Sequence, residues 1–160
     1  MKLLSNALLA LLAVTAPGAQ AAQYNGENRS HSPMLPKQVN ARWQQECSGC
    51  HLAFAPGLLP AASWRKIMSG LDHHFGADAS LAAQDVTEIT AFLEKNQANR
   101  WTSNAAPLRV TEGKWFAAKH REIAPAVWQR ASIKSANNCM ACHRSADKGV
   151  FDEHRVSIPK

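Results

Sequence analysis

The chain has 160 residues, and its 18 lysines and arginines outnumber its 12 aspartates and glutamates, giving a formal net charge of +6. This length suits one domain or two small ones. The basic residues are not gathered into a run, which disfavours a nucleic-acid-binding protein. The apolar stretch near the N-terminus is too short to cross a bilayer, and no second long apolar segment follows it.

The N-terminus has the pattern of a secretory signal peptide. Lys2 precedes the apolar stretch 7–14 and the small-x-small sequence Ala19-Gln20-Ala21, which is the order of charged, apolar and cleavage regions in such peptides. We predict that residues 1–21 are removed by cleavage near Ala21 and that the mature chain is exported, in a bacterium to the periplasm. Loss of Lys2 leaves 17 basic and 12 acidic residues, a net charge of +5.

All four cysteines lie in two short sequences of the same form. Residues 47–51 read CSGCH and residues 139–143 read CMACH, and C-x-x-C-H is the pattern that attaches a c-type haem. Two thiols three positions apart on a helical turn can reach both vinyl groups of one porphyrin, and the adjoining imidazole then lies beneath the iron. We predict two covalent haem c groups. The attachment residues are Cys47, Cys50, Cys139 and Cys142, and the proximal ligands are His51 and His143.

Other uses of paired cysteines fit less well. Zinc-binding pairs are usually about 15–20 residues apart, whereas 92 positions separate Cys50 from Cys142. A thioredoxin-like pair requires a βαβ pattern nearby, and the sequence lacks one. Two disulfides are conceivable in an exported chain, but they leave the histidine after each second cysteine unexplained.

The first half of the mature chain predicts a small helical segment, residues 22–100. It begins with a polar arm to about residue 40, followed by a helix over 40–52 that carries the first motif. A loop rich in proline and glycine spans 54–60, and Pro60 is placed as the first residue of a helix over 61–71. Ser80 offers an N-cap for a third helix, with an apolar stripe formed by Leu81, Val86, Ile89, Phe92 and Leu93.

The second half, residues 101–160, predicts another segment, with the boundary near 96–104. A helix over 112–121 and a turn at Pro125 precede a helix that Ser135 caps and that carries the second motif. The tail 144–160 reads as irregular. The expected fold is mainly α, a two-segment dihaem cytochrome c with short helices and long loops wrapped around two haems.

The ligand on the far side of each iron decides between an electron carrier and an open, reactive haem. For the first haem, His73 and His74 lie 22 and 23 residues after His51, and Met68 is a rival ligand. For the second haem, His120 lies 23 residues before His143. The two remaining histidines, His31 and His154, lie in polar surroundings and fit exposed positions. We also expect the second ring nitrogen of His51 to contact a backbone carbonyl near Pro56.

The chain resembles the DHC family of small periplasmic dihaem cytochromes c. The resemblance lies in the residues 47–76, which include PGLLPAASW and HFG, in the KHREI sequence at 119–123, and in the second motif. It implies bis-histidine ligation, by His51 with His74 and by His143 with His120. It also implies two redox partners, a membrane cytochrome b and a soluble haem protein like sphaeroides haem protein.

We therefore expect an electron carrier with no catalytic residues, relaying single electrons between those partners. The alternatives are a haem enzyme or sensor with one five-coordinate haem, which reduces peroxide or binds O2 or NO, and a dihaem subunit of a larger periplasmic reductase. The charge excess supports a partner at the second haem. Residues 22–100 hold seven basic and seven acidic residues, whereas 101–160 hold ten basic and five acidic, a distribution that can steer an acidic redox partner.

Overall fold

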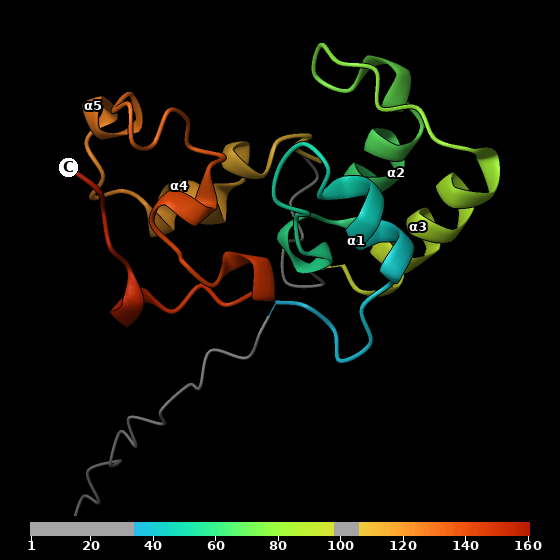
Figure 1. The fold of residues 1–160 in the computed structure, drawn as a ribbon, viewed down its shortest axis with the longest axis horizontal. Coiled ribbons are helices and arrows are strands. Elements are labelled where there is room, and N and C mark those ends of the chain that lie inside the picture. Colours follow the sequence, from blue (N-terminus) through green and yellow to red (C-terminus); the bar gives the residue numbers. More distant parts are fainter. Residues whose placement is uncertain (1–33, 98–105) are drawn as a thin grey trace, which may run out of the picture.

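A computed structural model of the chain describes residues 34–97 and 106–160 (Figure 1). Within these ranges the backbone forms short α-helices and 3-10 turns, and it has no β-strand. The predicted mainly α class is therefore confirmed. The signal peptide, His31 and most of the predicted boundary at 96–104 lie outside the described residues.

The helices form two lobes in Figure 1. One lobe holds α1 (Ala41–Cys47), α2 (Ala61–Met68) and α3 (Ala83–Lys95), and the other holds α4 (Lys114–Lys119) and α5 (Pro125–Trp128). Long connections with single 3-10 turns join them. None of the helices in the described ranges has the length and apolar sequence that a bilayer crossing requires.

Each helix of the first lobe has a local reason to form. At α1 the Asn40 side chain accepts a hydrogen bond of 2.7 Å from the Trp43 backbone N–H, which satisfies one free donor of the first turn. In α2 the apolar residues Trp64, Ile67 and Met68 recur at three and four, the spacing of one helix face. In α3 the first-turn Asp85 is favourable beside the positive end of the helix dipole.

The hydrophobic core lies where α1, α2 and α3 meet the loop after the first motif. Its least exposed members are Ile89 and Leu93 of α3 with Leu58 and Leu59 of that loop, all at 2 % exposure or below. Val110, from the second half of the chain, is buried in the same cluster. The described residues thus pack across the predicted boundary, and the division at residue 100 stays a prediction.

Several predicted helix ends were wrong. Ser80 is not the N-cap of α3, because its backbone N–H bonds to the Asp78 carboxylate in a turn and the helix begins after Ala82. Pro60 is the N-cap of α2 and not its first residue. Helix α1 ends at Cys47, so the rest of the first motif is a turn and bend. The helix predicted over 61–71 ends at Met68, and residues 71–73 form a separate 3-10 turn.

The second lobe is less helical than the sequence predicts. The helix expected over 112–121 is divided into a 3-10 turn at Val110–Glu112 and α4. Pro125 starts the one-turn helix α5 and not a simple turn. The second motif begins on a 3-10 turn, Cys139–Ala141, whose N-cap Asn138 forms no side-chain capping bond. The helix expected after Ser135 therefore does not form. The tail from residue 144 is irregular apart from two 3-10 turns.

The first described residue, Met34, contacts the C-terminal tail at Gly149. The Gly149 carbonyl accepts a hydrogen bond of 2.8 Å from the Met34 N–H, and the glycine's φ of +69° is in the left-handed region that favours glycine. A Cβ at this position would lie 2.8 Å from both the backbone N and the Cγ of Leu35. Gly149 therefore permits both the turn and the close approach.

We predict that Gly149→Ala destabilises the protein, because left-handed backbone costs about 1–2 kcal/mol in a residue with a Cβ and the clash with Leu35 adds to this. The measurement is urea unfolding of the haem-loaded protein. The control is Gly70→Ala, whose Cβ would lie 3.7 Å from its nearest neighbour and which should cost less than about 1 kcal/mol. Equal stabilities for the two variants would contradict the packing described here.

Candidate functional site

The first motif faces a second imidazole from a distant part of the chain. His51 follows the turn after α1, and His74 follows the 3-10 turn Leu71–His73. Their ring centres are 6.1 Å apart, and their planes are inclined by 21°. The structure therefore brings together one histidine of the motif and one of the two candidates that sequence spacing could not separate.

The second motif has an equivalent partner in the other lobe. His120 lies at the C-terminal end of α4, and its ring centre is 6.2 Å from that of His143, with the planes inclined by 85°. The two pairs thus share a separation but differ in ring orientation. One pair is near-parallel and the other near-perpendicular.

The Nδ1 atoms of two of these rings bind backbone carbonyl oxygens. His51 Nδ1 lies 2.7 Å from the Leu52 oxygen, and His120 Nδ1 lies 2.9 Å from the Phe116 oxygen. Because a carbonyl can only accept, Nδ1 must carry the proton in both rings, and the lone pair of Nε2 is then available to a metal. The acceptor for His51 was predicted near Pro56, which was wrong: the Pro56 carbonyl accepts the buried Trp64 indole N–H at 2.8 Å.

A tight turn presents His74. The Ala77 N–H bonds to the His74 carbonyl at 3.1 Å, and the two residues between them, Phe75 and Gly76, have φ of 55° and 101°. Positive φ at both central positions is the mark of a type I′ turn. Glycine adopts this backbone without cost, whereas Phe75 is strained in it.

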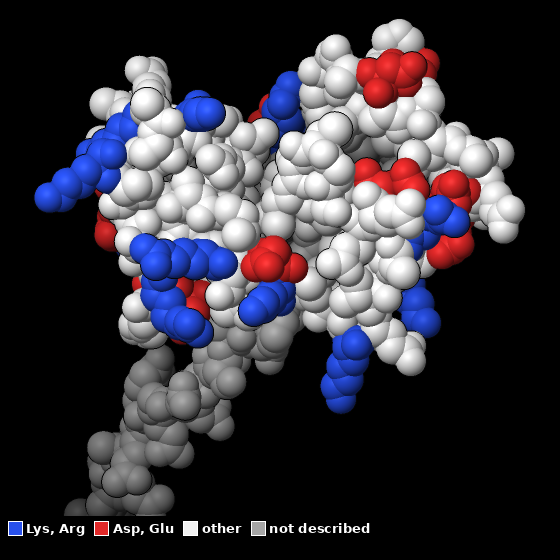
Figure 2. Space-filling model, in the orientation of Figure 1, with Lys and Arg blue, Asp and Glu red and all other residues white. Residues whose placement is uncertain are grey.

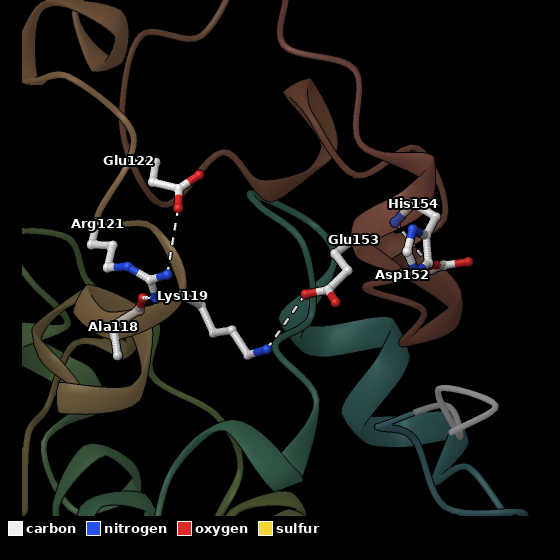
Figure 3. A network of polar contacts seen from close by, with 7 residues as sticks. All are labelled: Ala118, Lys119, Arg121, Glu122, Asp152, Glu153 and His154. Carbon is white, nitrogen blue, oxygen red and sulfur yellow. Dashed lines mark hydrogen bonds and ion pairs between the residues drawn. The ribbon is translucent and has the colours of Figure 1, made fainter. Parts of the chain in front are cut away.

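The other candidate ligands of the first pair lie elsewhere. The His73 side chain is 88 % exposed, and its Nδ1 pairs with the Asp72 carboxylate at 2.7 Å. Met68 is buried in the core cluster of the first lobe. Of these residues only His74 forms a ring contact with His51. His154, in the tail, is exposed on the 3-10 turn Glu153–Arg155, and its backbone N–H bonds to the Asp152 carboxylate at 2.9 Å (Figure 3).

Aromatic rings pack against His120, and the residue before it forms an ion pair. Its ring stacks on Phe116 of the same helix at 4.0 Å, and the Trp128 ring of α5 lies 5.7 Å away. Figure 3 shows the residue before it, Lys119, reaching across to Glu153 in the tail, with 3.5 Å between Nζ and Oε2. These contacts fix the ring and join its helix to the segment that follows the second motif.

The four cysteines form no disulfide with one another. Burial raises the pKa of Cys47 to about 11, with a smaller contribution from the Glu46 carboxylate, and burial also raises the pKa of Cys139 to about 11. Such thiols stay protonated at neutral pH and are poor redox thiolates or metal ligands. The described residues also contain no group of three or more His, Cys, Asp or Glu side chains placed to hold a metal ion. The raised pKa values disfavour thiol redox chemistry.

The imidazoles of His74 and His143 are held in the form that binds a metal. Burial lowers the pKa of His74, and the neighbouring His51 ring and the Arg109 guanidinium lower it further. Burial likewise lowers the pKa of His143, with a contribution from His120. A neutral imidazole is the ligating form of histidine.

Each ring pair has room for one metal ion between the rings. Two metal–imidazole bonds of about 2.0 Å, with about 1.1 Å from each nitrogen to its ring centre, place the ring centres about 6.2 Å apart. The observed separations are 6.1 Å and 6.2 Å. Two thiols stand beside each pair, so the donor set fits a covalent haem at each site. A small helical protein with two such sites falls in the class of multihaem c-type cytochromes.

Comparison with known proteins agrees with this class. A family model described as dihaem cytochrome c, DHC, matches residues 43–151. A diheme cytochrome c from Rhodobacter sphaeroides is 37% identical, with 71% of this chain and 97% of that chain covered and a TM-score of 0.65. A diheme cytochrome c from Shewanella baltica OS155 is 38% identical, covering 75% and 93%, with a TM-score of 0.68. No curated protein sequence matches the chain.

The chain belongs to the DHC family of dihaem cytochromes c. The resemblance stated from the sequence is confirmed, and so is the prediction of two covalently bound haem c groups. Family membership also implies electron transfer.

Sequence reasoning missed two features of the sites. The Leu52 carbonyl that anchors His51 carries no sequence signal, because every residue has a carbonyl. The contact of Arg109 with Phe75, at 4.2 Å from Cζ to the ring centre, joins residues 34 positions apart and was not expected. A phenylalanine before a glycine, directly after a candidate ligand, was the one visible hint of an unusual turn.

We predict that Trp64→Phe lowers the free energy of unfolding by about 1–3 kcal/mol, because it removes the indole donor and leaves the buried Pro56 carbonyl only the long bond of 3.5 Å from the Leu59 N–H. Urea unfolding of the haem-loaded variant is the measurement. The contrasting variant is Lys119→Ala, which removes an exposed ion pair (Figure 3) and should cost less than about 1 kcal/mol. An unchanged stability in Trp64→Phe would show that this hydrogen bond does not hold the loop beside His51.

Proposed function

We propose that the protein is a periplasmic electron carrier whose two haems are both ligated by two histidines. One haem would be attached to Cys47 and Cys50, with its iron between His51 and His74. The other would be attached to Cys139 and Cys142, with its iron between His143 and His120. The observation that carries this proposal is the separation of the ring centres, 6.1 Å and 6.2 Å, which suits one iron between each pair.

When bound, each haem supplies reversible one-electron chemistry between ferric and ferrous iron. The protein's own residues position and tune it. The carbonyls of Leu52 and Phe116 fix the tautomer and orientation of His51 and His120. Histidine at the sixth position, in place of methionine, favours a low reduction potential. With two histidines holding each haem, neither site would offer a free position to oxygen or peroxide, and the protein would perform no bond chemistry.

The proposed partners are a membrane-bound cytochrome b as electron donor and a soluble haem protein resembling sphaeroides haem protein as acceptor. The family resemblance suggests both, and the predicted signal peptide supports the periplasm as their meeting place. Charge supports docking at the second lobe, since residues 101–160 hold the whole basic excess. On the face drawn in Figure 2, basic side chains predominate over the lobe of α4 and α5, whereas acidic ones gather mainly on the lobe of α1 to α3.

An alternative is a haem enzyme or sensor with one five-coordinate haem. It would require His74 or His120 to lie away from its motif histidine. In both pairs, however, the ring centres are only about 6 Å apart. A dihaem subunit of a larger reductase differs only in its assembly. Gel filtration of natively purified protein separates it from a free carrier.

We predict two distinct low-spin signals in the electron paramagnetic resonance spectrum of the oxidised protein. Near-parallel imidazoles split the iron dxz and dyz orbitals and give a rhombic spectrum, whereas near-perpendicular imidazoles leave them almost degenerate and give one signal at a large g value. The 21° pair should give the first signal, and the 85° pair should give the second.

Variants assign these signals. His74→Ala should remove the rhombic signal and His120→Ala the large-g signal, each with a high-spin ferric signal in its place. His73→Ala is the matched control, because that side chain is exposed and paired with Asp72, and it should leave both signals intact. Loss of the rhombic signal in His73→Ala, or its survival in His74→Ala, would refute the assignment of His74.

We predict that carbon monoxide does not change the absorption spectrum of the reduced protein, because a six-coordinate bis-histidine iron has no free position. The His120→Ala variant should bind carbon monoxide at one of its two haems, which shows that the assay detects an open site. A stoichiometric shift in the unaltered protein would instead favour the enzyme or sensor.

A further inference from the structure

A cation from the second half of the chain lies over the aromatic ring that follows the proposed ligand of the first haem. The guanidinium carbon of Arg109 is 4.2 Å from the centre of the Phe75 ring. The Phe75 ring centre in turn lies 4.9 Å from that of His74. Arg109 belongs to the residues 101–160 that carry the second motif, so this contact crosses from one half of the chain to the site of the other.

The contact is a built feature of the turn. Phe75 holds a positive φ of 55°, which is uncommon outside glycine, and its side chain remains 46 % exposed. An arginine over the face of an aromatic ring is attracted by the ring quadrupole. Arg109 therefore stabilises this strained residue in the position next to His74.

The charge of Arg109 is only partly balanced. Its Nε lies 3.7 Å from Glu112 Oε1, and both side chains are about half exposed. An exposed pair of this kind is weak, so much of the positive field persists on the side of the turn.

We propose that Arg109 raises the reduction potential of the haem held between His51 and His74. Reduction adds one electron to ferric iron, and a nearby positive charge stabilises the less positive ferrous form. Arg109 is then a positioning and tuning residue that favours an electron on the first haem. This inference rests on the proposed function, since it takes His51 and His74 as the axial ligands.

The second site has arginines of its own. Arg144 and Arg155 line a cavity of about 230 Å³ beside His143. Their charges act on the second haem, so the inference concerns the contribution of Arg109 to the first haem and not the net difference between the two.

The test is a spectroelectrochemical titration of the haem-loaded protein, with the two potentials assigned from the loss of the rhombic and large-g resonance signals. Arg109→Gln should lower the equilibrium constant for reduction of the first haem by up to about tenfold. For a one-electron couple this is a fall of about 59 mV in the reduction potential. The potential of the second haem should shift less. Arg109→Lys keeps the charge and should retain most of the native potential.

Two further variants separate charge from structure. Glu112→Gln removes the balancing negative charge and should raise the potential of the first haem, opposite to Arg109→Gln. Arg65→Gln removes the same unit of charge at the Glu94 ion pair of α2 and α3 and should leave both potentials near their native values. An unchanged first potential in Arg109→Gln, equal shifts of both haems, or a downward shift in Glu112→Gln would each overturn the inference.

The resonance spectrum keeps the two proposals apart. If the unaltered protein shows both low-spin signals and Arg109→Gln leaves the first potential unchanged, the tuning proposal fails while the ligation stands. If the rhombic signal is missing from the unaltered protein, the ligation fails first.

Discussion

The proposed function depends on the separation of two imidazoles that would lie on either side of one iron. A metal–imidazole bond is short and directional, so the two ring centres must lie about 6.2 Å apart, with the Nε2 atoms facing inward. Both ring pairs meet the distance. In each pair one ring comes from an attachment motif and the other from residues 23 positions away, so the folding of each site depends on bringing these segments together.

Different local structures meet this requirement in the two lobes. His74 is presented by a tight turn with two consecutive positive φ angles, whereas His120 ends a helix and is held by its Phe116 carbonyl and aromatic neighbours. Because the backbones differ, the ring planes are near-parallel in one site and near-perpendicular in the other. With these ligands the two haems of one small chain would not be equivalent, and contacts such as that of Arg109 with Phe75 would add to the difference.

The sequence predicts the chemistry of this protein better than its geometry. The cysteine spacing fixes thioether attachment locally, and the apolar stripes of α2 and α3 follow from residue spacing, so both could be predicted. The choice of His74 over His73 and Met68 could not be made from spacing, because it depends on a turn that leaves His73 in solvent and Met68 in the core. The second motif was expected on a helix, but a single 3-10 turn carries it. Long-range contacts of the tail hold the chain there in place of helix propensity. One of them is the hydrogen bond from the Ser157 N–H to the Cys142 carbonyl, at 3.1 Å.

Electron transfer without bond chemistry follows only if both irons are closed on both faces. The most direct test is a crystal structure of the haem-loaded protein, with the irons located from their anomalous scattering. The account predicts one iron between the Nε2 atoms of His51 and His74 and the other between those of His120 and His143. An iron with water, Met68 or an empty position opposite its motif histidine would contradict it.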